Sequence, residues 1–363
     1  MHKMTLRTLP AWLIAFSGAA AASSFMVQEQ DASGIATSFA GSAAVAENAS
    51  TNFYNPAGLT NLKGLQISAG VTGLKSNIEY SVNGGNAGDT LLSPNFYVSM
   101  PLTQDLYAGF GVSRPFALKT EYTAGWTGDA LVRQTKLEST NYNPSLAYRL
   151  SDKVALGVGM NYQKLDLTLG QASGSLSGND SATGWNAGAL FTLSSAMRVG
   201  LAYRSGLNYR LNGALNGDLK LPAMFTLSVW QQVSDRWEAM GDLSYTQWNR
   251  LDQSTVAISA ADERNAWRFA WGAAYKYNDA VKAKFGFAYE RAATRRADLN
   301  LRAPENDRLW LSVGGQWNAG NAGKFDLGYA YKLSRDISTT QNGLNGRYET
   351  AGHVLGLQYS SGF

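Results

Sequence analysis

Strict alternation of large apolar residues with polar or small ones dominates the chain after residue 62. Between Trp267 and Tyr277 the odd positions are mostly aromatic, whereas the even positions are Ala, Gly, Arg or Lys. The stretch from Phe325 to Leu333 repeats this pattern. A period of two residues is typical of a β-strand with one apolar face. Between turn signals the pattern predicts about fourteen strands, with cores near residues 64–74, 91–101, 105–121, 136–150, 153–169, 184–194, 197–211, 221–233, 236–258, 265–277, 280–291, 307–318, 323–335 and 347–363.

The length of these segments and their aromatic ends indicate where the sheet lies. Soluble antiparallel sheets alternate too, so a secreted β-sandwich stays open on alternation alone. Aromatic residues gather near strand ends, as at Trp310 and Trp317, and aromatic girdles around an apolar band are typical of outer-membrane barrels. Because lipid offers no hydrogen-bond partners, a membrane sheet must close. The sequence therefore favours an all-β fold, a fourteen-stranded antiparallel transmembrane β-barrel over residues 62–363.

The first residues are typical of a secretory leader. Lys3 and Arg7 supply positive charge, residues 11–20 are mostly apolar, and three alanines end the stretch at Ala22. This arrangement predicts a signal peptide over residues 1–22, with cleavage near Ala22. An uncleaved N-terminal anchor is the alternative. Together with the barrel pattern, such a leader predicts that the mature chain lies in the outer membrane of a Gram-negative cell, as a multi-pass β-barrel.

Residues 23–61 do not alternate and are rich in Ala, Ser and Gly. They are predicted to pack as a small helical unit, either a periplasmic extension or a hatch that plugs the lumen. A fourteen-stranded barrel is wide enough to leave an open lumen if nothing fills it. The segment closes with Asn55-Pro56-Ala57, a turn in which proline fixes φ and biases the preceding residue away from helix. By itself this turn is a plain entrance to the first strand.

A second proline falls inside the third predicted strand. Proline cannot donate to a strand ladder and is confined to edges and bulges, and a closed barrel has no edge. Pro115 therefore predicts a local break, with Arg114, Phe116 and Ala117 beside it. The alternative is a bulge that merely begins an external loop.

Composition argues against several functions. Cysteine is absent, so thiolate metal sites and disulfides are excluded. Without the leader only His353 remains for acid–base or metal chemistry, no GxSxG elbow appears, and a serine nucleophile needs a base within reach. We therefore expect no enzyme activity, no cofactor and no metal. Removing Lys3 and Arg7 lowers the formal charge from +4 to +2, which argues against a nucleic-acid partner.

Several blocks together resemble the FadL/TodX family of outer-membrane transporters for long-chain fatty acids and other hydrophobic compounds. The likeness covers nearly the whole mature chain and ends at the C-terminal Phe363. The blocks that carry it include SSF at Ser23, NPA at Asn55, RPFALKTEY at Arg114, KLPAMFTLSVW at Lys220, WRFAWGAAYKYND at Trp267 and APENDRLWLSVGGQW at Ala303. The resemblance implies that residues 23–61 are a hatch, that Asn55, Pro56 and Ala57 latch it to the wall, and that Arg114–Ala117 forms a kink with a lateral opening.

The predicted function is passive uptake of a hydrophobic ligand, captured in a barrel pocket and released sideways through the third strand. A carboxylate head group would need a cationic partner, and strand parity places Arg204, Arg268 and Lys284 on the lumen side. The resemblance adds Phe25, since the mature N-terminus of the family reaches the binding region. The partners expected are a fatty acid or hydrocarbon, outer-membrane lipids and lipopolysaccharide, and the chain is expected to be a monomer.

Two other functions of the barrel remain possible from the sequence. A general diffusion porin would have a water-filled lumen, and a structural or adhesive barrel would have no ligand. The stretches Gln171–Thr183 and Asn208–Leu219 are predicted to be short, polar external loops. They depart from the large hydrophobic capture loops of the fatty-acid transporters, which leaves the substrate and the external docking site open.

Overall fold

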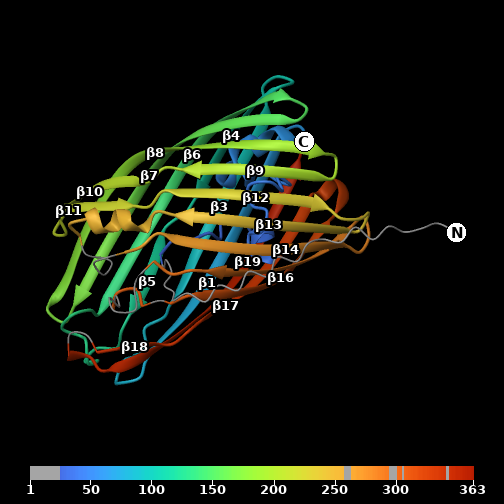
Figure 1. Cartoon of the computed structure of the whole chain (residues 1–363). Coiled ribbons are helices and arrows are strands. Elements are labelled where there is room, and N and C mark those ends of the chain that lie inside the picture. Colours follow the sequence, from blue (N-terminus) through green and yellow to red (C-terminus); the bar gives the residue numbers. More distant parts are fainter. Residues whose placement is uncertain (1–24, 257–262, 294–300, 305, 341–342) are drawn as a thin grey trace.

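The computed structural model describes residues 25–256, 263–293, 301–304, 306–340 and 343–363 (Figure 1). The predicted signal peptide, residues 1–22, lies outside them. Short helical elements come first, α1 (Ala32–Ala36), α2 (Thr51–Tyr54) and η1 (Pro56–Asn61), and η2 (Trp248–Gln253) and η4 (Gly320–Ala322) lie between strands. Among the described residues, no helix is both long and apolar enough to cross a membrane.

The rest of the described chain is mostly strand. The strands are β1 (Gln66–Tyr80), β2 (Gly85–Asn86), β3 (Thr90–Pro101), β4 (Leu106–Ser113), β5 (Ala117–Glu121), β6 (Gln134–Ser151), β7 (Val154–Gln171), β8 (Gly174–Ser194), β9 (Met197–Arg204), β10 (Leu207–Gly213), β11 (Gly217–Leu221), β12 (Met224–Gln232), β13 (Trp237–Thr246), β14 (Ala266–Lys276), β15 (Val281–Glu290), β16 (Arg308–Asn318), β17 (Lys324–Ser334), β18 (Ile337–Thr339) and β19 (Gly346–Gly362).

These strands close into one antiparallel ring. Each wall strand pairs with its neighbour in the chain, and β1 closes the ring by pairing with β19 from Gln66↔Gly362 to Tyr80↔Tyr348. Within the described residues the ring has 14 wall strands. In this part of the chain the short strands β2 and β18 pair only with β1 and β19, respectively, and lie outside the ring, and β4 with β5, β9 with β10, and β11 with β12 each form one interrupted strand. The predicted fourteen-stranded barrel is confirmed.

The wall differs from the predicted strands in three places. The stretch 236–258 was too long, because β13 ends at Thr246 and η2 follows. The loops predicted at Gln171–Thr183 and Asn208–Leu219 are wrong, since β7 and β8 continue to a turn at residues 172–173 and β10 pairs with β11 around residues 214–216. Each of these hairpins extends the wall, because its apolar positions alternate toward the lumen while the polar ones face outward.

The outer face carries the apolar band that a membrane requires. Aromatic rings pack along it in two belts, Trp237 against Tyr275 near one end and Tyr245 against Trp267 near the other. Tyr275 and Trp267 lie 8 positions apart on β14. At about 3.3 Å per residue and a tilt near 40°, that spacing spans roughly 20 Å, close to the apolar band of such barrels. The belts therefore mark the two membrane boundaries.

The N-terminal segment, residues 25–62, lies inside the ring (Figure 1). It hydrogen-bonds to wall strands on opposite sides, including β6 through Asn52, β12 through Ala43 and β19 through Ala32. The connections at residues 102–105, 152–153, 195–196 and 277–280 are short, and residues 65 and 363 meet at the same end. We call this the short-turn end and the opposite one the long-loop end.

The outward position of Leu311 gives a direct test of the wall. Leu311 is half exposed on β16 between the belts. Because a cation at the bilayer midplane costs about 2–4 kcal/mol in such barrels, Leu311→Arg should lower the free energy of unfolding by that amount. Denaturant titration in lipid vesicles measures it, with Leu311→Ala as the matched control. An equal loss for both variants would show that this face does not contact lipid.

Candidate functional site

Cationic side chains of the wall bind the backbone of the N-terminal segment. Short helices leave carbonyl groups without intrahelical partners. Arg204 on β9 donates to the Phe53 carbonyl at 2.7 Å, and its guanidinium lies 4.2 Å from the Phe53 ring centroid. Arg268 on β14 donates to the Ser38 carbonyl at 2.6 Å. A hydrogen bond from a charged donor contributes about 1.5–3 kcal/mol, so these contacts hold the segment in the lumen.

The Asn-Pro-Ala turn joins the segment to wall strand β8. The Asn55 side-chain amide donates to the Ala43 carbonyl at 2.7 Å and to the Ala189 carbonyl of β8 at 3.0 Å, and its oxygen accepts from the Ala57 N–H at 3.0 Å. Pro56 begins η1, where a missing N–H costs nothing. Ala57 is fully buried. One asparagine thus ties two parts of the segment to a wall strand.

Inward-facing glycines let the segment approach the wall. A Cβ added at Gly188 of β8 would lie 1.9 Å from the Asn55 side-chain oxygen. At Gly200 of β9 it would lie 1.9 Å from the Ala43 carbonyl oxygen, and at Gly286 of β15 it would lie 2.2 Å from the Thr37 backbone. No larger residue fits at these positions unless the segment moves away.

A charged cluster fastens the segment on another side. Glu47 pairs with Lys284 of β15, which also donates to Ser33. Burial alone would raise the pKa of Glu47, but Lys284 and Lys282 hold it below its ordinary value. Burial raises the pKa of Asp31 to about 6, although Ser50 and the Gly34 N–H donate to that carboxylate. Lys284 therefore neutralises Glu47, and among the described residues no cation forms an ion pair with Asp31.

The third wall strand is interrupted at residues 114–116. Before the break, β4 pairs with β3 on one side and β6 on the other. After the break, β5 pairs with β6, and residues 90–95 of β3 have no ladder with it. The Arg114 guanidinium spans the interval by donating to the Leu92 carbonyl at 3.0 Å, and a bridge between Gly88 and Thr120 closes its far end. The wall therefore contains a gap in its backbone hydrogen bonding, which we call the strand gap.

The start of the N-terminal segment pairs with the broken strand. The Val27 N–H donates to the Pro115 carbonyl at 2.8 Å, and the Ala117 N–H donates to the Phe25 carbonyl at 2.9 Å. The Gln30 side chain completes the contact, since it donates to the Arg114 carbonyl at 2.8 Å and accepts from the Arg114 N–H at 3.0 Å. Backbone groups freed by the break are therefore satisfied by the chain's own first described residues.

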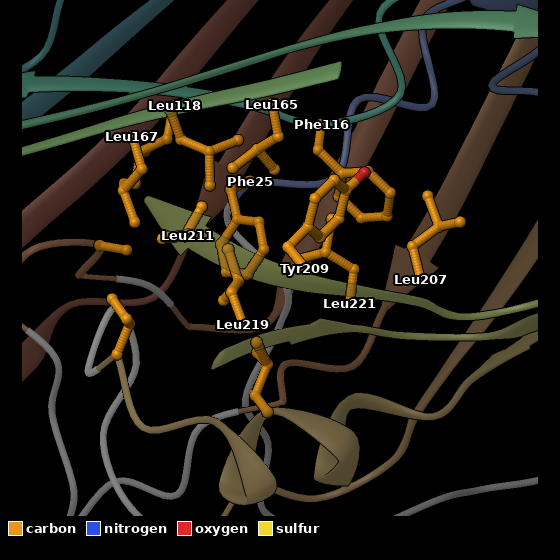
Figure 2. Packing of buried hydrophobic residues seen from close by; sticks show 14 of the residues in the cluster. Phe25, Phe116, Leu118, Leu165, Leu167, Leu207, Tyr209, Leu211, Leu219 and Leu221 are labelled. Carbon is orange, nitrogen blue, oxygen red and sulfur yellow. The ribbon is translucent and has the colours of Figure 1, made fainter. Parts of the chain in front are cut away.

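The same residues reach an apolar chamber toward the long-loop end. Figure 2 shows Phe25 among Leu211, Leu219 and Tyr209. The Phe25 ring lies 5.0 Å from that of Trp248 in an edge-on arrangement. We call this the Phe25 chamber, a cluster of buried residues that includes Phe116, Leu118, Leu137, Leu165, Leu167, Leu207, Leu221 and Leu251. The ring of Phe25 occupies space that an apolar compound could take.

A cavity of about 130 Å³ lies between the chamber and the strand gap. Met26 and Val27 line one side, Leu74 and Val354 belong to its wall, and Leu118 is shared with the Phe25 chamber. A cavity of roughly this size holds a molecule such as benzene. Lys75, Asp89, Lys119, Arg308 and Lys332 also line this cavity, so the space between the chamber and the gap is bordered by both apolar and charged side chains.

The predicted site residues divide into two groups. Phe25 lies beside Phe116 and Ala117 at the strand gap, with ring centroids of Phe25 and Phe116 6.3 Å apart. Arg204, Arg268 and Lys284 instead contact the N-terminal segment, and their role as ligand contacts stays a prediction. Within the described residues no group of three His, Cys, Asp or Glu side chains could hold a metal ion. The sequence analysis missed Gln30 and the inward glycines, although glycines at lumen parity were a visible signal.

The fold and these contacts define a class. A closed antiparallel barrel with an apolar outer band, its own N-terminal segment in the lumen and an apolar chamber is an outer-membrane transport barrel. The chain belongs to the family described as outer membrane protein transport protein (OMPP1/FadL/TodX), whose model matches residues 13–363. The predicted family and outer-membrane location are thereby confirmed.

Relatives and solved structures agree with this assignment. Outer membrane protein P1 of Haemophilus influenzae is 27% identical, with 93% of this chain and 92% of that protein covered. The long-chain fatty acid transport protein of Escherichia coli K12 is 23% identical over 100% of both chains. A Pseudomonas aeruginosa FadL homologue has a TM-score of 0.85 at 19% identity, covering 94% of this chain and 100% of that one. The Ralstonia pickettii toluene transporter TbuX has a TM-score of 0.69 at 17% identity, covering 91% and 97%.

The contacts of Asn55 give a test of how the segment is held. Asn55→Ala leaves the Ala43 and Ala189 carbonyls without their donor, which should cost about 2–4 kcal/mol of docking free energy. Amide hydrogen exchange across residues 43–62 should accelerate accordingly, while the barrel still inserts. Asn212→Ala, at an exposed asparagine of β10, is the control. Unchanged exchange in Asn55→Ala would show that the turn is only an entrance to β1.

Proposed function

We propose that this chain is a passive outer-membrane transporter for hydrophobic compounds, which are captured in the Phe25 chamber and released sideways through the strand gap. One observation carries the proposal. The side chain of Phe25 occupies the chamber, while its carbonyl accepts from Ala117 at the gap. A compound that displaces the ring also removes the backbone that fills the gap, so binding and opening are one event.

The names of the relatives support the class of substrate. Relatives are described as transport proteins for long-chain fatty acids, and structural neighbours as toluene transporters or monoaromatic hydrocarbon channels. All of these compounds are rich in apolar surface. Burial of each methylene contributes about 0.8 kcal/mol, so an apolar chamber extracts such compounds from dilute solution without an energy source.

The path follows from the arrangement of apolar space. A ligand enters at the long-loop end, which corresponds to the cell exterior because such barrels have short periplasmic turns and longer external loops. It replaces Phe25 in the chamber and moves past Leu118 into the cavity beside Met26. From there the strand gap leads to the lipid outside the wall, which the exposed Leu92 faces. Release into lipid is downhill for an apolar compound.

Gln30 acts as the closing element of this path. Its side-chain amide binds both the carbonyl and the N–H of Arg114. These two hydrogen bonds must therefore break before the N-terminal residues can separate from the broken strand. The rest of the segment is held independently by Asn55, Arg204 and Arg268. We therefore propose that residues 25–30 move during transport, and that Asn55-Pro56-Ala57 keeps the remaining hatch in place.

The structure gives less support to a general porin or to a structural or adhesive barrel, the two alternatives that the sequence left open. A general porin needs a continuous water-filled lumen, whereas the N-terminal segment contacts β6, β12 and β19 across this one. A purely structural or adhesive barrel gives no reason for an apolar chamber adjoining a gap in the wall. We also propose that one chain suffices, since its ring closes on itself, and that the surrounding partners are outer-membrane lipids and lipopolysaccharide.

A reversible crosslink tests the sideways path. Met26 and Phe116 form an antiparallel bridge, a geometry that suits a disulfide, and the chain has no other cysteine. The double variant Met26→Cys/Phe116→Cys, when oxidised, should lose at least about tenfold of its uptake, because a covalent link keeps the gap filled. Reduction should restore uptake. The measurement is initial uptake of radiolabelled toluene and of a long-chain fatty acid by cells that lack their own copy.

The control pair is Val71→Cys/Leu357→Cys, register partners on β1 and β19. This crosslink lies in the intact wall and should leave uptake unchanged. Full uptake by the oxidised Met26→Cys/Phe116→Cys protein would contradict release through the strand gap.

A further inference from the structure

The Phe25 chamber contains polar atoms that its own residues do not satisfy. The indole N–H of Trp248 is buried and has no hydrogen-bond partner within the described part of the chain. The Tyr209 hydroxyl is also buried, and the Gln163 amide lies close to it, but no hydrogen bond of normal geometry joins them. A buried donor without a partner costs about 1–3 kcal/mol. Native interiors rarely leave such donors unpaired unless a ligand or water completes them.

These two donors lie in the Phe25 chamber, where the ligand is proposed to bind. Trp248 and Tyr209 are both members of the Phe25 chamber, in which the other members are aliphatic or aromatic hydrocarbons. Trp248 packs edge-on against the Phe25 ring, with centroids 5.0 Å apart. A phenylalanine ring offers these donors neither oxygen nor nitrogen. The Phe25 side chain therefore matches the apolar surface of the chamber but makes no hydrogen bond to the Trp248 N–H or the Tyr209 hydroxyl.

Within the described part of the chain, the cations near the chamber bind other protein groups. Arg250, in the same short helix as Trp248, donates to the Leu221 carbonyl and to the Asn208 side chain. Arg204 and Arg268 donate to the carbonyls of Phe53 and Ser38. A carboxylate entering the chamber would lose its hydration without gaining one of these partners. Burial of an unpaired ion is far more costly than burial of a neutral oxygen that accepts a hydrogen bond.

We propose that the Phe25 chamber selects an uncharged, ring-sized compound bearing one hydrogen-bond acceptor oxygen, such as an aryl ketone, ester or ether. This inference rests on the proposed transport function and names the ligand class of the same chamber. The ring of the compound replaces the Phe25 ring, and its oxygen accepts from Trp248 or Tyr209. A site with a free donor favours a compound that supplies the acceptor over an analogue that lacks it.

The preference is tested with three probes of similar size. They are acetophenone, which has a ring and a carbonyl, isopropylbenzene, which lacks the acceptor, and benzoate, which carries a charge. Binding to the full-length protein in detergent is measured by calorimetry for the native chain, Trp248→Phe and Tyr209→Phe. Each substitution removes one donor and keeps an aromatic ring. Trp126→Phe is the matched control, because Trp126 packs in a separate cluster and donates to the Val132 carbonyl.

The native chain should bind acetophenone and should bind benzoate at least about tenfold more weakly. If Trp248 is the donor to acetophenone, Trp248→Phe should lower the affinity for acetophenone about three- to tenfold, and if Tyr209 is the donor, Tyr209→Phe should do so. Isopropylbenzene affinity should stay within about twofold in every variant, and Trp126→Phe should leave all three probes unchanged. Equal loss of acetophenone and isopropylbenzene in both chamber variants would mean a purely steric role and would overturn the inference.

Different results would contradict the proposed ligand class and the proposed transport function. Tight benzoate binding, or acetophenone binding that neither chamber variant changes, contradicts the proposed ligand class while leaving hydrophobic transport intact. If none of the probes binds and a long-chain fatty acid does not bind either, the chamber is not a ligand site and both proposals fail. A fatty acid that binds while all three ring compounds fail overturns only the ring-sized class.

Discussion

Backbone hydrogen bonding in lipid is the constraint on which this structure depends. A peptide group facing hydrocarbon has no water to bond, so a membrane sheet must satisfy every group within itself. The barrel meets this demand around most of its circumference, but at Pro115 the third strand is interrupted and its second part, β5, has no ladder with β3. There the first described residues of the same chain supply the missing partners, through Val27 and Phe25. The backbone groups that the interruption leaves unpaired are thus satisfied by the residues that we propose to move during transport.

The rest of the N-terminal segment is held by contacts of a different kind. Arginines of the wall bind its free carbonyls, Asn55 joins it to β8, and glycines at inward positions leave room for its backbone. These contacts involve the wall strands β8, β9, β14 and β15 and do not include the strand gap. In the proposed mechanism, residues 25–30 separate from the wall while these contacts keep the rest of the segment in the lumen. In that mechanism an apolar compound then reaches lipid through the strand gap.

The barrel was predictable because its period of two and its aromatic spacing each follow from one physical demand of the membrane. Pro115 marked a strand interruption for the same reason, since proline has no N–H to donate. The polar stretches at residues 171–183 and 208–219 were misassigned as loops, because a hairpin above the membrane faces water on its outer side and loses the apolar contrast. Gln30 and Trp248 could not be assigned from sequence, since their roles depend on which distant strands they meet.

The conformation of residues 25–30 in the ligand-bound protein tests most directly whether ligand binding opens the strand gap. The measurement is residue-resolved hydrogen exchange of the full chain in lipid nanodiscs, with and without saturating acetophenone or toluene. If the ligand displaces Phe25, the amides of Val27 and Ala117 should exchange faster when it is bound, because each donates across the strand gap. The amides of Asn55 and Leu62 should not change. Slower or unchanged exchange at Val27 and Ala117 would contradict the claim that binding and opening are one event.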